Sequence, residues 1–259
     1  MGDDGFPEGK VSRPARFALR YPIVEDVAII DGAELHHLRD VMRLRVGATI
    51  ALLTPHNVEH LARIECFEND RAIVRIQKTA TAAEIPPLIL ATAIIKGPRM
   101  DFIVEKAAEL GVTELWPMLC ARSVVRAPGL ERIDRWRRLA IAAAKQSLAP
   151  TALELHEPTR FEDLIETFAR DTLESASKLK LICTMGAEPI ASVVPRLKLH
   201  SIVVACGPEG DFTDSEIDLA KDAGFVPTSL GNNRLRSETA AIAAVSIAAA
   251  LFDEFRTGD

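Results

Sequence analysis

Several features that mark common protein classes are missing from this sequence. The four cysteines are scattered and form no Cys-x-x-Cys pair, which predicts reduced, mostly buried thiols of the kind found in cytosolic proteins. The polar N-terminal stretch MGDDGFPEGKVSRP has no apolar signal-peptide core, and no apolar run reaches the length of a membrane span. We therefore expect a cytoplasmic protein, with a loose tail at residues 1–12.

Motifs of common nucleotide enzymes and hydrolases are also missing. The chain contains neither the phosphate-loop pattern G-x-x-x-x-G-K-[ST] nor the dinucleotide-binding pattern G-x-G-x-x-G. It also lacks G-x-S-x-G, the turn that presents the nucleophilic serine of α/β-hydrolases. These absences disfavour a conventional doubly wound nucleotide enzyme and a serine hydrolase.

Acidic residues outnumber basic residues, but unevenly along the chain. The net charge of −6 disfavours a protein that is basic over its whole surface. Residues 88–150 reverse the sign, with 10 Lys and Arg against 6 Asp and Glu, whereas residues 151–259 have 10 against 18. A surface for RNA would therefore be local, formed by this middle segment and by selected arginines of residues 1–87. The alternative is that these charges lie on solvated helix faces.

The strongest local pattern occupies residues 203–240, VVACGPEGDFTDSEIDLAKDAGFVPTSLGNNRLRSETA. It predicts a buried strand, a glycine turn, a helix that starts with a capping box, a second strand, a second glycine turn and an Ala-rich helix. In chain order, these elements are Ser201–Cys206, Gly207–Gly210, a helix capped by Thr213 and Glu216, Phe225–Leu230, Gly231–Asn233 and a helix capped by Ser237.

Two glycine turns at the carboxyl ends of neighbouring strands are typical of the ligand crevice of an open α/β sheet. The alternative is two ordinary loops without a ligand. The first turn and the helix start after it carry four carboxylates, and negative charge at a helix start opposes a polyphosphate. A ligand that is neutral or cationic where it meets these loops fits better. The four carboxylates are Glu209, Asp211, Asp214 and Glu216.

The segments GPEGDFTDSEI and LGNNRLRSETAAIAA resemble the C-terminal signature of the RsmE family. The resemblance covers about residues 15–259 and implies S-adenosylmethionine-dependent methylation of uridine N3 in 16S ribosomal RNA. It also implies the fold of the SPOUT superfamily, an α/β domain in which a trefoil-knotted parallel sheet carries helices on both faces. The alternative is a divergent, non-catalytic protein that keeps the knotted fold and acts in RNA binding or ribosome assembly.

Residues 13–78 are expected to form a small β-rich domain, because short strand candidates alternate there with turns. The pattern HHL-x-x-VMRL-R-x-G resembles the PUA-like RNA-binding β-barrel domain of the RsmE family. It lies in the one predicted helix, Ala33–Leu44, whose apolar face is formed by Leu35, Leu38, Val41, Met42 and Leu44. The predicted strands are Phe17–Tyr21, Val27–Ile30, Thr49–Leu53, Leu61–Phe67 and Ala72–Ile76.

Residues 79–87, TATAAEIPP, have the composition of a linker, so the methyltransferase domain is expected to span residues 88–259. A strand–helix–strand pattern at Leu88–Met118 predicts a βαβ unit and hence a parallel sheet, with Asp101 capping the helix. In the long helix that follows, Trp136 is expected in the core. We expect no metal, because no cluster with metal-ligand spacing surrounds the adjacent histidines near residue 36.

The resemblance also implies the site residues. Arg236 could hold a uracil carbonyl or a phosphate and favour an N3 anion, and Glu238 could accept the N3 proton. Alternatively, these two side chains form a structural ion pair at the helix start. The backbone turns would hold the cofactor, S-adenosylmethionine, because glycine allows close approach of the main chain. The implied cofactor residues are Thr184, Gly207, Pro208, Glu209, Gly210, Leu230, Gly231, Asn232, Leu235 and Thr239.

The implied partners are 16S ribosomal RNA or the small ribosomal subunit, and a second copy of the chain in a homodimer. A set of basic residues on loops would hold RNA phosphates. They are Arg16, Arg20, Arg39, Arg43, Arg45, Lys96, Arg99, Arg122 and Arg126.

Three positions depart from the family pattern. Asp211 stands where the family usually has a second glycine, Asn233 stands where it usually has an arginine, and residues 148–150 lack an arginine that often follows Ser147. The cofactor turns are unaffected by these changes. The substrate side is therefore where specificity or activity would differ.

Overall fold

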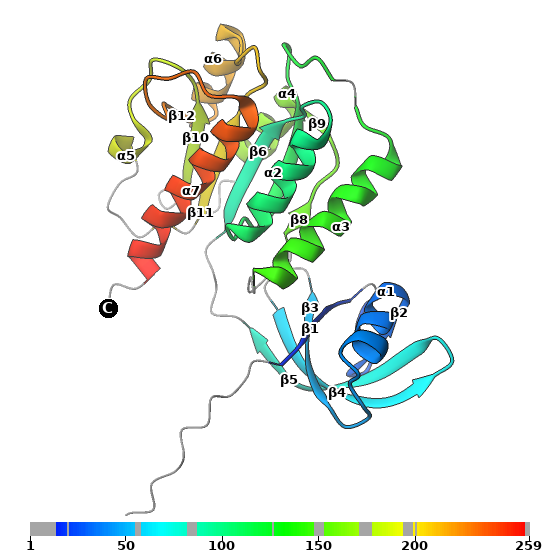
Figure 1. The fold of residues 1–259 in the computed structure, drawn as a ribbon. Helices are drawn as coiled ribbons and strands as arrows, with labels where there is room; N and C mark the ends of the chain where they lie inside the picture. The colour runs from blue at the N-terminus through cyan, green and yellow to red at the C-terminus, as the bar shows by residue number, and fades with distance from the viewer. Residues whose placement is uncertain are drawn as a thin grey trace, which may run out of the picture. The chain divides into compact units, whose positions relative to one another are not determined.

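The computed structural model of the chain describes residues 14–19, 21–54, 58–81, 87–125, 127–147, 153–170, 178–193, 199 and 201–256 (Figure 1). The chain forms two compact units. The first comprises Met1–Thr54 and Val58–Ala80, and the second comprises Pro55–Asn57 and Thr81–Asp259. The predicted tail at residues 1–12 and residues 82–86 of the predicted linker lie outside the described residues.

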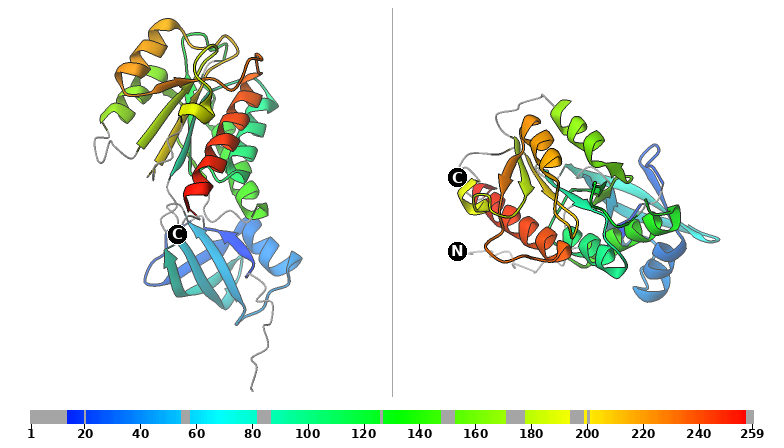
Figure 2. Two further views of the ribbon diagram at one scale, coloured as in Figure 1. Left: turned by 90° about the vertical axis from the view of Figure 1, so that its left-hand side faces the viewer. Right: turned by 90° about the horizontal axis from the view of Figure 1, so that it is seen from above.

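The first unit is a curled five-stranded sheet in the order β1-β3-β4-β5-β2 (Figure 2). Strand β1 is parallel to β3, whereas the pairs β3–β4 and β2–β5 are antiparallel. All five strands predicted for this part of the chain are present, and β5 extends three residues into the predicted linker. Their bounds are β1 Arg16–Ala18, β2 Val27–Asp31, β3 Thr49–Thr54, β4 Val58–Glu68 and β5 Arg71–Thr81.

The predicted helix at Ala33–Leu44 is shorter than expected and changes type. An α-helical turn, α1 (Gly32–His36), passes into a π-helical turn, η1 (His37–Val41), which ends with a bond from the Met42 N–H to the His37 carbonyl at 2.9 Å. A π-turn holds more residues than an α-turn, so the residues after it rotate away from the α-helical apolar face. The prediction of a continuous apolar face was therefore wrong: Leu35 and Leu38 are buried, but Val41 and Met42 are exposed.

The second unit contains a parallel sheet in the order β12-β10-β11-β6-β7-β8, with β9 also pairing with β7. Every residue of β6 and β11 is buried, as the uninterrupted apolar runs predicted. The bounds are β6 Leu88–Ala93, β7 Glu114–Leu119, β8 Glu154–Leu155, β9 Thr159–Arg160, β10 Lys178–Cys183, β11 Ser201–Cys206 and β12 Val226–Thr228.

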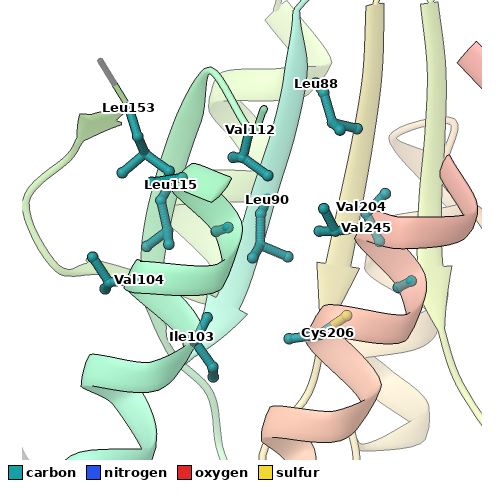
Figure 3. Close-up of a cluster of buried hydrophobic side chains, with 14 of the residues drawn as sticks. Leu88, Leu90, Ile103, Val104, Val112, Leu115, Leu153, Val204, Cys206 and Val245 are labelled. Atoms are coloured by element: carbon teal, nitrogen blue, oxygen red, sulfur yellow. The ribbon is translucent and has the colours of Figure 1, made fainter. Parts of the chain in front are cut away.

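Helices cover both faces of this sheet (Figures 1 and 2). Residues of α2, α3 and α7 share one hydrophobic cluster with the sheet, and residues of α4 and α6 share the other. Figure 3 shows Leu90 and Val204 of the sheet facing Val245 of α7. No helix in the described part of the chain is both long and apolar enough to cross a membrane. The bounds are α2 Pro98–Glu109, α3 Leu130–Gln146, α4 Phe161–Arg170, α5 Ile190–Val193, α6 Asp214–Asp222 and α7 Ser237–Arg256.

Two predicted helix caps have different outcomes. The capping box of α6 is confirmed, because Thr213 and Glu216 exchange the two expected bonds. Asp101 does not cap α2: the helix begins earlier, with Gly97 at the N-cap position. Instead, the Asp101 carboxylate accepts hydrogen bonds from the Trp136 indole N–H at 2.9 Å and from Arg135 Nε at 3.0 Å. Trp136 itself is fully buried, as predicted.

Candidate functional site

A cavity lies at the carboxyl end of the parallel sheet of the second unit. It encloses about 580 Å³ of empty space, part of it open to solvent, and is lined from the three segments 183–185, 206–211 and 230–240. These segments follow strands β10, β11 and β12. The sequence predicted that the strands before the two turns are neighbours. In the structure, β11 and β12 instead lie on either side of β10. The two predicted glycine turns therefore enclose the end of β10 between them.

Side-chain and main-chain bonds tie the two turns to each other and to β10. Arg234, in the second turn, donates from Nη2 to the main-chain carbonyl of Glu209 in the first turn at 2.9 Å. The Thr184 N–H, just after β10, donates to the Thr228 carbonyl at 2.8 Å. The Thr184 hydroxyl also lies 3.5 Å from Asp211 Oδ2. The walls of the cavity are thus fixed to one another by contacts between residues far apart in the sequence.

The first turn, residues 207–212, has two glycines that lie close to other groups. A Cβ atom on Gly207 would lie 3.1 Å from the Phe212 ring, and one on Gly210 would lie 3.2 Å from Arg122 Cβ. Both distances are shorter than ordinary van der Waals contact. A side chain at either glycine would therefore require the neighbouring Phe212 or Arg122 to shift by a few tenths of an ångström.

Arg122 supports this turn from the side of β7. Its Nη1 atom donates to the main-chain carbonyls of Gly210 at 2.9 Å and Phe212 at 3.0 Å. Glu216 adds a second link, because its Oε1 atom accepts from the Ala121 N–H at 2.8 Å while Oε2 accepts from the Thr213 N–H at 2.8 Å. The residues after β7 and the start of α6 thus hold the first turn in place together.

Asp211, one of the departures from the family pattern, has φ = +62°. Glycine adopts this left-handed conformation without strain, and aspartate is one of the few other residues that tolerate it. The Asp211 carboxylate accepts from the Phe212 N–H at 2.8 Å, and the residue lines the cavity. Asp211 therefore has the left-handed backbone conformation that glycine favours, and it adds an acidic residue to the lining of the cavity.

Most of the residues implied to bind cofactor lie at this cavity. Seven of the ten line it: Thr184, Gly207, Pro208, Glu209, Leu230, Gly231 and Leu235. Gly210, Asn232 and Thr239 lie on the same segments but are not among the lining residues. The sequence reasoning missed Cys183, Met185, Cys206, Asp211, Asn233, Arg234, Ser237 and Ala240. Their place at the carboxyl ends of strands and in the two turns is the signal that could have identified them.

Two of the missed residues, Cys183 and Cys206, are in register on the adjacent strands β10 and β11. The hydrogen bond with Cys183, together with complete burial, raises the pKa of the Cys206 thiol well above its ordinary value. Cys206 is therefore protonated at neutral pH and is a poor nucleophile. No group of His, Cys, Asp and Glu side chains suitable for a metal ion occurs among the described residues.

The two residues implied to be catalytic flank Ser237 at the start of α7. Arg236 is exposed, whereas the Glu238 side chain is only 13% exposed. Neither lines the cavity. Glu238 forms an ion pair with Arg99, with Arg99 Nη1 lying 3.6 Å from Glu238 Oε2. Arg99 also donates from Nη2 to Glu209 Oε1 at 3.0 Å, so it links the first turn with the start of α7.

The basic residues implied to bind RNA belong to both units. Arg39, Arg43 and Arg45 are exposed in the first unit, where Arg16 is half-buried in β1. Lys96 is exposed in the second unit, whereas Arg99 and Arg122 make the contacts described above. Arg20 and Arg126 lie outside the described residues.

Both units match known protein families. A family model for an RNA methyltransferase domain matches residues 82–249, and one for an RNA methyltransferase PUA domain matches residues 30–77. The ribosomal RNA small subunit methyltransferase E of a Synechocystis species is 30% identical over 89% of this chain and 75% of its own length. The Bacillus subtilis protein of the same name is 29% identical over 84% of this chain and 87% of its own length.

A solved structure gives the same result. The ribosomal RNA small subunit methyltransferase E from Neisseria gonorrhoeae, bound to S-adenosyl methionine, has a TM-score of 0.73 at 30% identity. The match covers 93% of this chain and 98% of the Neisseria chain. The present chain therefore belongs to the family of ribosomal RNA small subunit methyltransferase E.

Proposed function

We propose that this protein uses S-adenosylmethionine to methylate N3 of a uridine in the 16S RNA of the small ribosomal subunit. The observation that carries the proposal is the cavity enclosed by the turns GPEG and LGNNRL in a chain of this family. The names of the relatives support small-subunit RNA as the substrate, and the Neisseria structure supports the cofactor. No observation on the described residues favours the non-catalytic alternative.

The residues at the cavity fit this cofactor. When bound, S-adenosylmethionine supplies a methyl group carried on a positively charged sulfonium. Two acidic residues, Glu209 and Asp211, line the cavity together with one cation, Arg234, so the lining has a net negative charge that favours a cation over a polyphosphate. Main-chain groups of residues 207–211 and 230–235 would hold the adenosyl part, because the glycines there leave the backbone open to close approach.

Removal of the N3 proton is the chemical task that falls to side chains of the protein. We assign it to Glu238, whose Oε2 atom is buried and has no hydrogen-bond partner in the described part of the chain. This atom is buried beside Arg99, so the bound RNA would have to expose it before the carboxylate could take the proton from the base. Arg236, exposed at the same helix start, would hold a uracil carbonyl and stabilise the negative charge that develops on the ring.

The role of Glu238 has a direct test. Replacing Glu238 with glutamine keeps the shape but removes the acceptor charge, and we expect kcat to fall by about 10²- to 10⁴-fold, the range for loss of a general base. The affinity for S-adenosylmethionine should be unchanged. If Glu238→Gln turns over normally, Glu238 is not the proton acceptor and has only a structural role as the ion-pair partner of Arg99. The corresponding test of Arg236 is the turnover of Arg236→Ala.

The proposal extends to the fold and assembly of the protein. A trefoil knot in the second unit is supported by the path of the chain, which leaves β12 at one edge of the sheet and returns in α7 over β6 and β11. The curled sheet of the first unit supports a PUA-like β-barrel. A homodimer and a cytoplasmic location complete the proposal. The free cysteines favour a reducing compartment, and sedimentation analysis would test the dimer.

Cofactor binding is the first experiment, and α7 supplies a matched pair of variants. Ala240 lines the cavity, whereas Ala250 is exposed on the same helix. We expect calorimetric titration to give saturable binding of S-adenosylmethionine and S-adenosylhomocysteine to the wild type and to Ala250→Leu. Binding to Ala240→Leu should be lost, because the larger side chain fills the cavity. No binding to the wild type at millimolar ligand would support the non-catalytic alternative.

The substrate is tested by mass spectrometry of nucleosides. Small ribosomal subunits from cells that lack this protein should gain 3-methyluridine when incubated with the wild-type protein and S-adenosylmethionine. A different methylated nucleoside would change the assigned position, and no methylation of subunits or free 16S RNA would contradict the proposed activity.

A further inference from the structure

Two thiols lie side by side in the wall of the cavity, and the proposed methyl transfer uses neither of them. Cys183 is the last residue of β10 and Cys206 is the last residue of β11, and both line the cavity. Both are free cysteines rather than halves of a disulfide. A pair of free thiols is thus available at the place where the cofactor is expected to bind.

The sheet places the two sulfur atoms on one face and close together. Cys183 pairs with Cys206 in the parallel register of β10 and β11. Neighbouring strands lie about 4.8 Å apart, which is within the Cα separation of about 4.4–6.8 Å that one bridge between two cysteines spans. The preceding residues, Ile182 and Ala205, belong to the hydrophobic cluster of one face, whereas both cysteines belong to the cluster that includes α7 (Figure 3). Their side chains therefore point the same way.

Burial limits the chemistry that is open to this pair. Cys183 is 8% exposed and Cys206 is 1% exposed. Burial and the hydrogen bond with Cys183 raise the pKa of the Cys206 thiol well above its ordinary value, so a bare thiolate is unfavourable in this wall. A reaction that suits the site must instead transfer both thiol protons to a leaving group and leave a neutral product.

Trivalent arsenic, supplied as uncharged arsenous acid, As(OH)₃, meets this requirement. Two As–S bonds form while two As–O and two S–H bonds break, and the protons leave with the hydroxyl groups as two water molecules. Arsenic stays trivalent, so the reaction needs neither an oxidant nor a reductant. The third hydroxyl group remains on the arsenic. Two thiols are therefore enough, although the described residues contain no group of three side chains that could hold a metal ion.

We propose that Cys183 and Cys206 form a dithiol site that captures trivalent arsenic, and that the occupied site excludes the cofactor. Cys183 is the more exposed thiol and forms the first bond. The second bond, to Cys206, is then intramolecular and gains from a high effective concentration. Exclusion of the cofactor rests on the proposed function, because it assumes that S-adenosylmethionine occupies this cavity. Capture of arsenic does not rest on it.

Native mass spectrometry of the full chain titrated with arsenite tests the capture. The wild type should gain one arsenic atom per chain, with the loss of two water molecules. Cys183→Ala and Cys206→Ala should each bind arsenite about a hundredfold more weakly, because one thiol forms only one bond. Cys120→Ala is the matched control, since Cys120 is also a buried thiol but is not among the residues that line the cavity. It should bind arsenite like the wild type.

Three measurements on the wild type do not depend on how well the variants fold. Saturating S-adenosylhomocysteine should protect the protein from arsenite. Calorimetry should show that the arsenic-loaded protein no longer binds S-adenosylhomocysteine. The dithiol 2,3-dimercaptopropanol should restore binding, whereas 2-mercaptoethanol at the same thiol concentration should not, because a monothiol cannot form two bonds to the same arsenic from one molecule.

The outcomes separate this inference from the proposed function. If the wild type takes up no arsenic, or if folded Cys183→Ala and Cys206→Ala bind arsenite like the wild type, the dithiol site is wrong. If the arsenic-loaded protein still binds S-adenosylhomocysteine, exclusion of the cofactor is wrong. If the wild type captures arsenic but binds neither S-adenosylmethionine nor S-adenosylhomocysteine, the proposed function fails and the dithiol site stands.

Discussion

Arg99 lies 3.6 Å from Glu238, measured from Nη1 of the guanidinium to Oε2 of the carboxylate. The same Oε2 atom accepts no hydrogen bond in the described part of the chain. The other guanidinium nitrogen, Nη2, is bonded to the Glu209 carboxylate in the wall of the cavity. Arg99 was expected to be a phosphate contact, but its position indicates that it holds two acidic residues of the site in place.

The first prediction concerns this role of Arg99. Arg99→Gln should lower kcat by about tenfold, because loss of the guanidinium releases Glu238 from its position. The KM for the ribosomal subunit should change little, and Arg99→Lys should restore part of kcat. Steady-state kinetics with labelled S-adenosylmethionine measures both quantities.

Lys96 provides the matched control for this prediction, since it is an exposed cation just before α2, three positions from Arg99. Lys96→Gln should leave kcat unchanged. If Arg99→Gln instead raises KM at constant kcat and reduces the salt dependence of RNA binding, Arg99 is a phosphate contact after all.

The second prediction concerns Arg122, which was also expected to contact RNA. Its guanidinium bonds to the carbonyls of Gly210 and Phe212, so Arg122→Gln should disorder the first turn and weaken S-adenosylmethionine binding by about tenfold. The salt slope of RNA binding should not change. Calorimetry and RNA titration test the two parts separately, and unchanged cofactor affinity with a smaller salt slope would reverse the assignment.

Gly210→Val probes the same contact from the opposite side. A Cβ atom on Gly210 meets the aliphatic part of Arg122, so the valine should displace the arginine and reduce cofactor affinity without unfolding the protein. The sequence implied a different role for Gly210, close approach of its main chain to the cofactor. Because both changes remove the same contact, Gly210→Val/Arg122→Ala should bind no more weakly than Gly210→Val if the steric explanation holds, whereas additive losses would favour direct contact with the cofactor.

Local chemistry explains what the sequence could predict. The uninterrupted apolar runs of β6 and β11, the capping box from Thr213 to Glu216 and the burial of Trp136 depend on short-range patterns, and all were predicted correctly. The family also followed from sequence, because the two turn motifs are specific when they occur together. The knot, by contrast, came only from the resemblance and remains a proposal.

The errors arose where long-range contacts override a local pattern. The sequence around Asp101 allows a helix cap, but the buried indole of Trp136, 35 residues away, takes the carboxylate as its acceptor. The spacing in Ala33–Leu44 fits an α-helix, but the π-turn changes its register after His37. The hydrogen bonds of Arg99 and Arg122 could not be predicted locally, because their partners follow about 90 to 110 residues later in the chain. Their assignment to RNA stays a prediction.

The third prediction concerns the bond between Asp101 and Trp136. Asp101→Ala should destabilise the protein by about 1–3 kcal/mol, the cost of leaving a buried indole N–H without an acceptor. Asp134→Ala is the control, because Asp134 pairs with Arg137 on the exposed surface of the same unit and should contribute less than about 1 kcal/mol. Urea denaturation measures both. Equal effects of the two variants would indicate that water replaces the lost acceptor.

The fourth prediction separates the two roles of Asp211. Its backbone has φ = +62°, which favours glycine, and the residue lines the cavity. Asp211→Gly should therefore keep the stability within about 1 kcal/mol, since relief of strain offsets the added freedom of the unfolded chain. Asp211→Ala should be less stable than Asp211→Gly by about 1–2 kcal/mol, because a Cβ atom is unfavourable in the left-handed region.

Cofactor affinity should not follow this order of stability. Both variants remove the carboxylate, so both should bind S-adenosylmethionine about tenfold more weakly if Asp211 faces the sulfonium. Binding of S-adenosylhomocysteine, whose sulfur is neutral, should change much less. If the two ligands lose the same affinity, Asp211 shapes the turn rather than recognising charge. If neither loses affinity, the carboxylate lies outside the contact, and the family's glycine and this aspartate are interchangeable at the cofactor.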